Sequence, residues 1–339
     1  MSGRTIAVAA AIDDTFANGL LVTLHSAARN LSPGWKLETY VFGFEITPAS
    51  RARVDQGLAG LPVRLHWRKL DLSAVDPYWP GLNNPRDTTC YYRLFLGDTL
   101  PETVDRVLFL DADLLIHRDL AELWHLPFEG NIAMAVPDAY PRGHRSRLSR
   151  IAFADGQRFT GDTPYFNAGV QLIDLSRWRT ERIGSRACEL LWKYKDQLDG
   201  RDQDALNITL AGRWKRLPPT WNFHELPEGP DDWDAGGASP TEVADAVRHP
   251  AILHYIGWKP WSRAWRPHRS RLWWRAARAA GVATAPRILH VAIWDALFWG
   301  PHTRLRWLLR RANHRGFALL MLMRPWTAVT YPLWRLTQR

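Results

Sequence analysis

The chain has 339 residues, of which 46% are hydrophobic and 23% charged, so it is long enough for one large core or two domains and is neither disordered nor fibrous. Its two cysteines, Cys90 and Cys188, form no CxxC spacing, which argues against a disulfide framework or a cysteine zinc site and fits a reducing cytoplasm. The formal net charge of +10 resides in the C-terminal part, because residues 262–339 contain 15 arginines, no lysine and one acid, whereas residues 1–261 are mildly acidic.

The N-terminal part alternates apolar runs typical of strands with segments of helical spacing. We expect strands at residues 5–11, 37–43, 63–67 and 105–110, and helices at residues 18–30, 47–60 and 88–101. The segment 47–60 has a threonine N-cap, a proline in its first turn and a closing glycine, which are helix start and stop signals. Acids follow the first apolar run where a signal-peptide cleavage site would lie, so this run is expected to be the first strand. Such alternation predicts an α/β fold with a largely parallel sheet covered by helices.

The rest of the globular part continues this pattern. We expect a strand at residues 131–137, a strand leading into a helix at 164–179, a short helix at 202–212, a long loop at 217–240 and a final strand running into a loop at 251–261. The compact body is expected to end near Trp261, which divides the chain into a globular domain at 1–261 and a basic helical tail at 262–339. Ligands bind at the carboxyl ends of parallel strands, and the pairs Asp13–Asp14 and Asp111–Asp113 each follow a strand directly.

The C-terminal tail combines its arginines with eight of the 19 tryptophans. Its apolar patches, residues 288–299 and 316–323, are shorter than the ~18 uninterrupted apolar residues that a membrane-spanning helix needs. Alternation of such patches with arginine-rich segments is typical of amphipathic helices that lie at the surface of an anionic membrane. The alternative is a helical subdomain that packs its Leu/Trp stripe on the body.

Two aspartates one residue apart, Asp111 and Asp113, follow the apolar run RVLFL in the segment FLDADLLIHRDL. Alternate residues of a strand share a face, so both carboxylates are expected to lie together and to repel unless the strand end is solvated or a cation binds. Carboxylate oxygens suit a hard divalent cation such as Mg²⁺ or Mn²⁺. A solvated loop is the alternative, and the motif alone does not exclude it.

Three further motifs add candidate site residues. His254 ends the apolar run of ILHYIG, where it is either a core or capping histidine or, beside two aspartates, a ligand that favours Mn²⁺ over Mg²⁺. Gly257 and Lys259 in GWKPW suit a diphosphate clamp next to a metal, because glycine permits close approach and lysine supplies charge. Asp202 and Gln203 open a helix, where acids also serve as caps. The absence of GxxxxGKS/T, GxGxxG, HExxH and GxSxG motifs argues against a P-loop ATPase, a dinucleotide enzyme, a zincin and an α/β-hydrolase.

Five motifs follow one another along the chain: AAIDDTF, YYRLFLGDTLPETVDRVLFLDADLLIHRDLAELW, YFNAGVQLIDLSRWR, DQDALN and LHYIGWKPW. In this order they resemble glycosyltransferase family 8, in particular its bacterial lipooligosaccharide α-galactosyltransferases, with glycogenin and bacterial glucosyltransferases as relatives. The resemblance covers residues 5–261. It implies a GT-A fold, which is Rossmann-like with a mostly parallel mixed sheet and flanking helices. It also implies a retaining transfer of a hexose, galactose or glucose, from a UDP-sugar to a saccharide or lipid-linked acceptor in lipopolysaccharide or other cell-surface glycan synthesis.

The resemblance also assigns roles to individual residues. It implies that Asp111, Asp113 and His254 are ligands of Mn²⁺ or Mg²⁺. The implied donor contacts are Asp13, Asp14, Thr15, Arg93, Asp111, Ala112, Asp113, Asn167, Gly257 and Lys259. Asp138 is implied as an acid that contacts the acceptor or the sugar, and Asp202 and Gln203 as catalytic residues. Because the Gln203 amide is a poor nucleophile, we favour same-face attack guided by the departing phosphate over a covalent intermediate.

Two positions depart from the family pattern. Thr15 stands where the family often has asparagine, and only Trp258 separates Gly257 from Lys259 where two residues are usual. These departures motivate an alternative function, a non-catalytic membrane-associated protein that binds UDP-sugars or carbohydrates. A nucleotidyltransferase would need a glycine-rich N-terminal phosphate loop, which AAIDDTF is not. No nucleic-acid partner is expected, and the expected location is cytoplasmic, peripheral at the inner face of the cell membrane.

Overall fold

The computed structural model describes residues 4–69, 89–139, 162–194, 200–224, 237–257, 259–261 and 269–282, with shorter stretches between 145 and 160 and at 197–198. One compact unit spans Met1–Ala285, and the second unit, Pro286–Arg339, lies outside the described residues. Both predicted amphipathic patches belong to that second unit, so a membrane-binding tail stays a prediction. Among the residues that the structure describes, no helix has the length and apolar character needed to cross a membrane.

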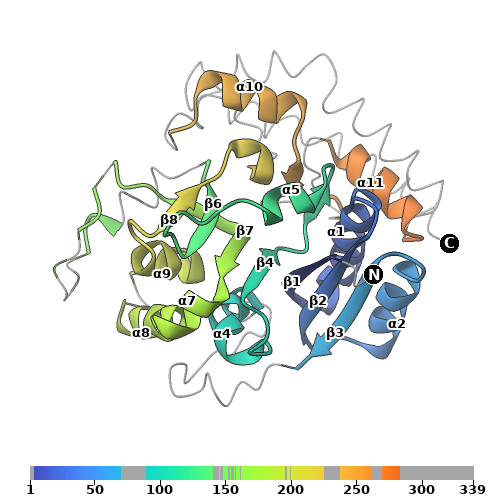
Figure 1. The fold of residues 1–339 in the computed structure, drawn as a ribbon, viewed down its shortest axis with the longest axis horizontal. Coiled ribbons are helices and arrows are strands. Elements are labelled where there is room, and N and C mark those ends of the chain that lie inside the picture. The colour runs from blue at the N-terminus through green and yellow to red at the C-terminus, as the bar shows by residue number, and fades with distance from the viewer. Residues whose placement is uncertain are drawn as a thin grey trace, which may run out of the picture. The chain divides into compact units, whose positions relative to one another are not determined.

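A seven-stranded mixed sheet forms the centre of the compact unit, in the order β3-β2-β1-β4-β7-β6-β8 (Figure 1). The strands are β1 (Arg4–Asp13), β2 (Trp35–Phe44), β3 (Val63–Arg68), β4 (Arg106–Leu110), β6 (Ala133–Pro137), β7 (Phe166–Asp174) and β8 (Trp214–Arg216). Strand β7 is antiparallel to its neighbours β4 and β6, and the other pairs are parallel. This confirms the predicted α/β fold with a mostly parallel sheet.

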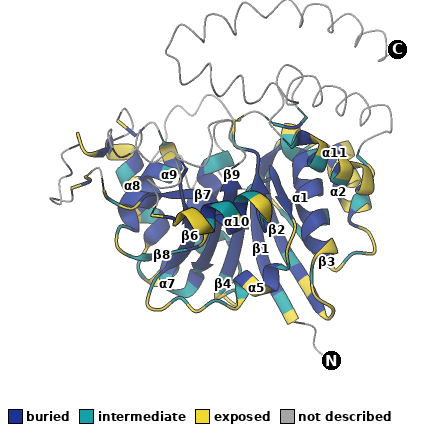
Figure 2. Cartoon of the chain, turned by 90° about the horizontal axis from the view of Figure 1, so that it is seen from above, coloured by how far each residue is buried: buried dark blue, intermediate teal, exposed yellow. Residues whose placement is uncertain are grey.

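Helices cover both faces of this sheet, which buries its central strands on each side. The first face carries α1 (Ala17–Arg29), α2 (Pro48–Gly57) and α11 (Ser270–Ala279). The second face carries η4 (Thr89–Phe95), α4 (Leu96–Thr99), α7 (Leu175–Thr180), α8 (Ile183–Tyr194) and α9 (Arg201–Thr209). Ala7 and Ala9 of β1 belong to the core under the second face, whereas Ile6 and Val8 alternate toward α1 and are fully buried. Figure 2 shows that the central strands are buried, whereas the edge strands β3 and β8 contain no buried residue, and exposed residues lie on the outer sides of helices such as α2.

A second, three-stranded sheet has the order β5-β10-β9 and consists of β5 (Leu114–Ile116), β10 (Ile252–His254) and β9 (Phe223–His224). The free edge of β5 lies against α1, whose side chains take the place of a neighbouring strand. Thr23 bonds both backbone groups of Leu114, Ser26 accepts from the Ile116 amide, and Asn30 donates to the Ile116 carbonyl. These residues lie on one face of the helix, so α1 fixes β5 and the turn that precedes it.

Several predicted elements need correction. Residues 217–240 are not one loop, because they contain η5 (Pro219–Asn222) and β9, whose pairing with β10 overrides the loop-like composition. The segment 88–101 is a 3-10 helix followed by a single α-turn, η4 and α4, rather than one α-helix. Asp111 and Asp113 lie in a turn between β4 and β5 rather than on one face of a strand. The other predicted strands and helices are present near their expected positions, whereas α5 (Leu120–Trp124), α8, α10 (Pro240–Arg248), β5 and β8 lie in segments for which no element was predicted.

Helix α11 begins beyond the predicted end of the body at Trp261. Its residues Trp273 and Trp274 are buried, and the indole N–H of Trp274 donates to the Pro260 carbonyl at 2.9 Å. The Trp273 ring also packs against Trp261, with 5.0 Å between ring centroids. The compact unit therefore continues past residue 261, and this first helix of the basic region packs its tryptophans on the body.

Candidate active site

The turn that carries Asp111 and Asp113 is held from two sides. The Asp111 amide donates to the Gly169 carbonyl of β7 at 2.8 Å, and Thr23 of α1 holds the Leu114 backbone immediately after the turn. Helix α1 approaches closely because Gly19 has no side chain, and a Cβ there would lie only 2.3 Å from the Ala112 carbonyl oxygen. The Asp113 side chain is buried, whereas that of Asp111 is 28% exposed, so the turn opens toward solvent on the Asp111 side.

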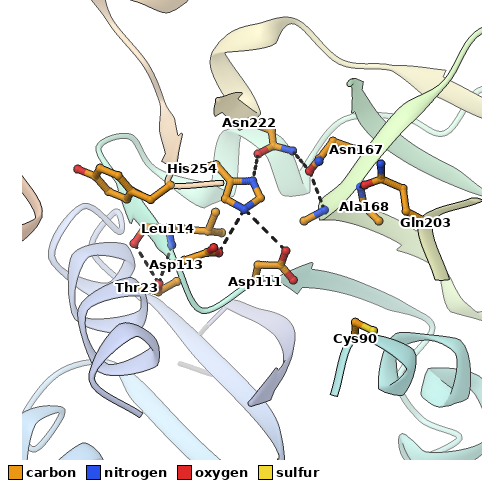
Figure 3. Close-up of polar contacts among 12 residues, drawn as sticks. Thr23, Cys90, Asp111, Asp113, Leu114, Asn167, Ala168, Gln203, Asn222 and His254 are labelled. Carbon is orange, nitrogen blue, oxygen red and sulfur yellow. Dashed lines mark hydrogen bonds and ion pairs between the residues drawn. The ribbon is translucent and has the colours of Figure 1, made fainter. Parts of the chain in front are cut away.

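His254 joins the two aspartates because β10 pairs antiparallel with β5 and sets His254 opposite Leu114. Its Nε2 atom lies 3.2 Å from Asp113 Oδ1 and 3.8 Å from Asp111 Oδ2 (Figure 3). One possible ligand atom from each of the three residues lies within 4.8 Å of the others. The structure thus brings together the three residues that the sequence predicts as metal ligands, from segments about 140 residues apart in the sequence.

This donor set fits a divalent cation. Asp113 Oδ1 is buried and makes no hydrogen bond to the described residues, although the His254 ring nitrogen faces it. Burial alone would raise the pKa of the Asp113 carboxyl, but the adjacent positive charge of Lys259 holds that pKa below its usual value. Asp113 therefore stays ionised, and two carboxylates with one imidazole form a ligand set that Mn²⁺ accepts.

Lys259 reaches the same cluster despite the shortened loop before it. Its Nζ atom pairs with Asp113 Oδ2 and donates to the Tyr255 carbonyl at 3.0 Å. Gly257 has a φ of +72°, a left-handed conformation that favours glycine. The turn at Gly257 therefore brings Lys259 to the edge of the candidate metal site, and its role in clamping a diphosphate stays a prediction.

Arg93 is buried and bridges the metal cluster to helix α9. Its guanidinium contacts Asp111 Oδ1 at 3.0 Å and Asp202 Oδ2 at 2.9 Å, and it also donates to the carbonyls of Ala168 and Cys90. Burial lowers the pKa of Arg93, but the charges of Asp111 and Asp202 outweigh burial and raise that pKa above its ordinary value. Burial raises the pKa of Asp202, which the charge of Arg93 opposes. Arg93 thus orients one predicted metal ligand and one predicted catalytic acid at the same time.

Asp138, Asn167 and Gln203 meet beside this bridge. Asp138 Oδ2 accepts hydrogen bonds from Asn167 Nδ2 and Gln203 Nε2, each at 3.1 Å, and Gln203 Oε1 accepts from the Ala168 amide at 2.9 Å. The next residue along α9, Asp204, instead accepts from Gly200 N at its own helix start. The three consecutive side chains of the DQD sequence therefore have different partners: Asp202 pairs with Arg93, Gln203 bonds Asp138, and Asp204 caps the start of α9.

The N-terminal pair lies at the same edge of the sheet, where β1 ends. Asp13 Oδ1 accepts from the amides of Thr15 and Phe16 at 2.8 and 3.2 Å and caps η1 (Asp14–Phe16). Asp14 Oδ1 accepts from the Thr47 amide at 2.8 Å. Burial raises the pKa of Asp14, but the hydrogen bonds to Thr47 bring it below the ordinary value. Asp13 and Asp14 therefore order the loops around this edge, and their contact with a donor stays a prediction, as does that of the exposed Thr15.

A family model described as Glycosyl transferase family 8 matches residues 7–264. The chain belongs to glycosyltransferase family 8. It is 27% identical over 263 residues to General stress protein A of Bacillus subtilis, an alignment that covers 76% of this chain and 88% of that protein. It is 34% identical over 134 residues to Lipopolysaccharide 1,2-glucosyltransferase of Escherichia coli, covering 39% of this chain and 37% of that protein.

Solved structures share the fold of this chain. The crystal structure of galactosyltransferase LgtC in complex with donor and acceptor sugar analogs is 27% identical, with a TM-score of 0.63, and the match covers 83% of this chain and 97% of that one. The apo structure of the bifunctional glycosyltransferase WbbM matches with the same TM-score of 0.63 at 20% identity, over 82% of this chain and 50% of that one. The family 8 chain therefore has the GT-A fold that the motifs imply.

Two residues of this family 8 site were not predicted from the sequence. Asn222 is fully buried, and its Oδ1 atom lies 2.8 Å from Nδ1 of His254. Gly169 lies against the other side of the cluster, where a Cβ would be 2.3 Å from Cε1 of His254. The only signal for Asn222 is a polar residue directly after Trp221 in a segment that looks like a loop. Gly169, in YFNAGV, is a glycine inside a strand, which can mark a close approach of another group.

Proposed function

We propose that the protein is a retaining hexosyltransferase that moves galactose or glucose from a UDP-sugar to a saccharide acceptor, assisted by Mn²⁺ or Mg²⁺. The observation that carries the proposal is the convergence of Asp111, Asp113 and His254 at the carboxyl edge of a family 8 GT-A sheet. The LgtC structure, solved with donor and acceptor sugar analogs, and the glucosyltransferase named for lipopolysaccharide support a role in lipopolysaccharide or other cell-surface glycan synthesis.

The proposed donor half of the site consists of charges held in fixed positions. A bound metal ion would neutralise the negative charge that develops on the diphosphate as the sugar departs. Asp111, Asp113 and His254 would hold that ion, and Lys259 adds a positive charge at the same edge. The ion pair with Arg93 holds the Asp111 carboxylate in place, so that this ligand does not have to reorganise when the donor binds.

The sugar half of the site favours same-face attack over a covalent intermediate. Gln203 has an amide rather than a carboxylate, and both ends of this amide are already held, by Asp138 and by the Ala168 backbone. Asp202 is paired with the buried Arg93 guanidinium, which engages its carboxylate oxygen. A held amide is suited to stabilise a positively charged sugar through its oxygen, and the acceptor hydroxyl would attack beside the departing phosphate.

For the basic C-terminal region we propose association with an anionic membrane surface. Because α11 packs on the body, the region that remains for this role begins after residue 285. A chain truncated after residue 285 is expected to keep donor hydrolysis but to lose binding to vesicles that contain an anionic lipid. Equal vesicle binding by the truncated and full-length chains would refute the membrane role.

The experiment that tests the activity is incubation with a panel of UDP-sugars, with Mn²⁺ and with a chelator, while UDP release is measured. We expect release from UDP-galactose or UDP-glucose that requires the metal and is lost in Asp113→Asn, because one ligand carboxylate becomes an amide. Tight UDP binding without release from any UDP-sugar would instead favour the alternative, a non-catalytic UDP-sugar-binding protein derived from such a transferase. Release that is unaffected by the chelator and by Asp113→Asn would overturn the metal-assisted mechanism.

A further inference from the structure

A continuous line of hydrogen bonds runs from the candidate metal ligand His254 to the sugar side of the site. Nδ1 of His254 lies 2.8 Å from Asn222 Oδ1, and Asn222 Nδ2 donates to Asn167 Oδ1 at 2.9 Å (Figure 3). Asn167 Nδ2 in turn donates to Asp138 Oδ2, which also accepts from Gln203. The side chains of Asn222, Asn167 and His254 are each less than a tenth exposed, so protein groups rather than bulk solvent determine their bonding.

The direction of this line follows from one backbone group whose chemistry is unambiguous. The Gly169 amide can only donate, and it points at the Asn167 side chain at 3.0 Å, so the atom it meets is the carbonyl oxygen. That places the Asn167 NH₂ group toward the Asp138 carboxylate, which is an acceptor. Asn222 must therefore present its own NH₂ group to the Asn167 oxygen, and its carbonyl oxygen is left facing the His254 ring.

An oxygen acceptor beside Nδ1 requires that His254 carries its proton on Nδ1. In the neutral ring, Nε2 then has a free lone pair, and it faces two carboxylate oxygens, Asp113 Oδ1 at 3.2 Å and Asp111 Oδ2 at 3.8 Å. Nε2 of His254 and the two carboxylate oxygens each offer a lone pair toward the same point, and no proton lies between them. Such an arrangement is suited to binding one shared cation. Metal-ligating histidines commonly have their second ring nitrogen fixed in this way.

We propose that Asn222 is a positioning residue that locks His254 in the Nδ1–H tautomer, directs Nε2 at the metal, and couples the metal site to Asp138 and Gln203 through Asn167. The inference rests on the proposed function only for the presence of a metal, because the tautomer follows from the hydrogen bonds of the protein alone. Asn222 has this role because η5 ends at Asn222 and continues directly into β9, which pairs with β10 and so holds the amide beside His254.

Three variants separate positioning from general destabilisation. Asn222→Ala removes both the acceptor for His254 and the donor for Asn167. Asn222→Asp keeps an oxygen toward His254 but has no NH₂ group to offer Asn167. Thr220→Val is the matched control, because Thr220 lies in the same short helix and bonds His249 and Ala251 without contacting His254.

The first readout is Mn²⁺ affinity, measured from the electron paramagnetic resonance signal of free Mn²⁺ in titrations with and without UDP. Asn222→Ala is expected to weaken Mn²⁺ binding about 10- to 100-fold, the usual effect of removing such a partner, whereas Thr220→Val should bind as the wild type does. Asn222→Asp should retain Mn²⁺ affinity but lower kcat, since Asn167 and the Asp138–Gln203 pair lose their link to the metal side. Thermal unfolding of each variant reports loss of structure separately.

The second readout needs no metal. Long-range ¹H–¹⁵N spectra of histidine-labelled protein, with the His254 signals assigned by their absence in His254→Gln, show which ring nitrogen is protonated. We expect a protonated Nδ1 in the wild type and a mixture of tautomers in Asn222→Ala. A protonated Nε2 in the wild type, or unchanged spectra and Mn²⁺ affinity in Asn222→Ala, would overturn the inference. Failure of the wild type to bind Mn²⁺ would count against the proposed function, and the tautomer spectrum would still decide the inference.

Discussion

Gly169→Ala tests whether the candidate metal cluster depends on the close approach of β7. Gly169 lies opposite Asp111 across the β4–β7 pair, since Leu110 pairs with Val170 and the Asp111 amide donates to the Gly169 carbonyl. A Cβ at this position would lie 2.3 Å from Cε1 of His254 and 2.8 Å from Asp111 Oδ2. Carbon atoms in contact are about 3.5–4.0 Å apart, so the imidazole ring must move by more than about 1 Å to admit one methyl group.

The expected consequences follow from this displacement. A shift of about 1 Å in a catalytic group can cost about 100-fold in rate, so kcat/KM for the UDP-sugar should fall by about that factor. Overpacking of a well-filled site costs about 1–3 kcal/mol, so the free energy of unfolding should decrease by that amount. The assays are metal-dependent UDP release, Mn²⁺ binding and urea unfolding, all on the full-length chain.

Two comparisons make the result specific. Gly97→Ala is the control, because its Cβ would lie 3.2 Å from Trp178 Cδ1 in a helical segment away from the metal cluster, and it should leave UDP release close to the wild-type rate. In the double variant Gly169→Ala with His254→Ala, the added methyl group meets a shortened side chain, so part of the lost stability should return while activity does not. Wild-type UDP release and Mn²⁺ binding by a folded Gly169→Ala protein would refute the reasoning.

Three further changes probe the groups around the site. Arg93→Met leaves the buried Asp202 carboxylate and the partly exposed Asp111 carboxylate without their shared cation and should lower the free energy of unfolding by about 3–5 kcal/mol, measured in urea; an unchanged unfolding midpoint would contradict the bridging role. Thr23→Val removes the hydroxyl that bonds both backbone groups of Leu114 and should cost about 1–3 kcal/mol, and equal stability to wild type would show that α1 does not hold β5 in this way. The hydrogen bonds of Arg216 lower the pKa of Glu242 from 4.5 to about 2, so the unfolded chain takes up this proton first as the pH falls. The stability from this pair is therefore complete above pH 4.5 and lost toward pH 2, and urea midpoints of Glu242→Gln should depend less on pH in that window than those of the wild type; parallel curves would rule the pair out as a source of acid sensitivity.

The fold and the residues of the candidate metal cluster could be predicted because each leaves a local signal. Burial on one or two faces imposes the periodicity of strands and helices. The start of α2 is recognisable in the sequence from the N-cap Thr47 and from Pro48 in the first turn. Asp111 and His254 each end an apolar run, which is where a buried strand reaches the edge of a sheet, and Asp113 follows two residues after Asp111. That these three residues lie close together could be predicted only from the order of the family motifs, because no local sequence pattern indicates that β10 pairs with β5.

The supporting residues left no comparable signal. Asn222 sits in a segment rich in proline, glycine and tryptophan, and its position depends on the pairing of β9 with β10, which forms only in the folded chain. A donor contact of Arg93 stays a prediction, and its bridge between Asp111 and Asp202 left no signal in the sequence because it depends on the packing of η4 against α9. Such contacts join segments far apart in sequence, and composition and periodicity do not encode them.

The reversed direction of β7 explains why the sugar side and the metal side of the site meet. At the carboxyl edge of the sheet, β1, β4 and β6 end at Asp13, Leu110 and Pro137, so the acids that follow or end these strands gather there. Because β7 is antiparallel to β4 and β6 (Figure 1), it presents its first residues at this edge. Asn167 therefore lies beside Asp138. A parallel β7 would bring its last residue, Asp174, to the same place and leave the Asp138 cluster without Asn167. The rule that ligands bind at the carboxyl ends of strands thus identifies the acids that follow these strands, whereas the Asn167 amide comes from the start of the one antiparallel strand described in the main sheet.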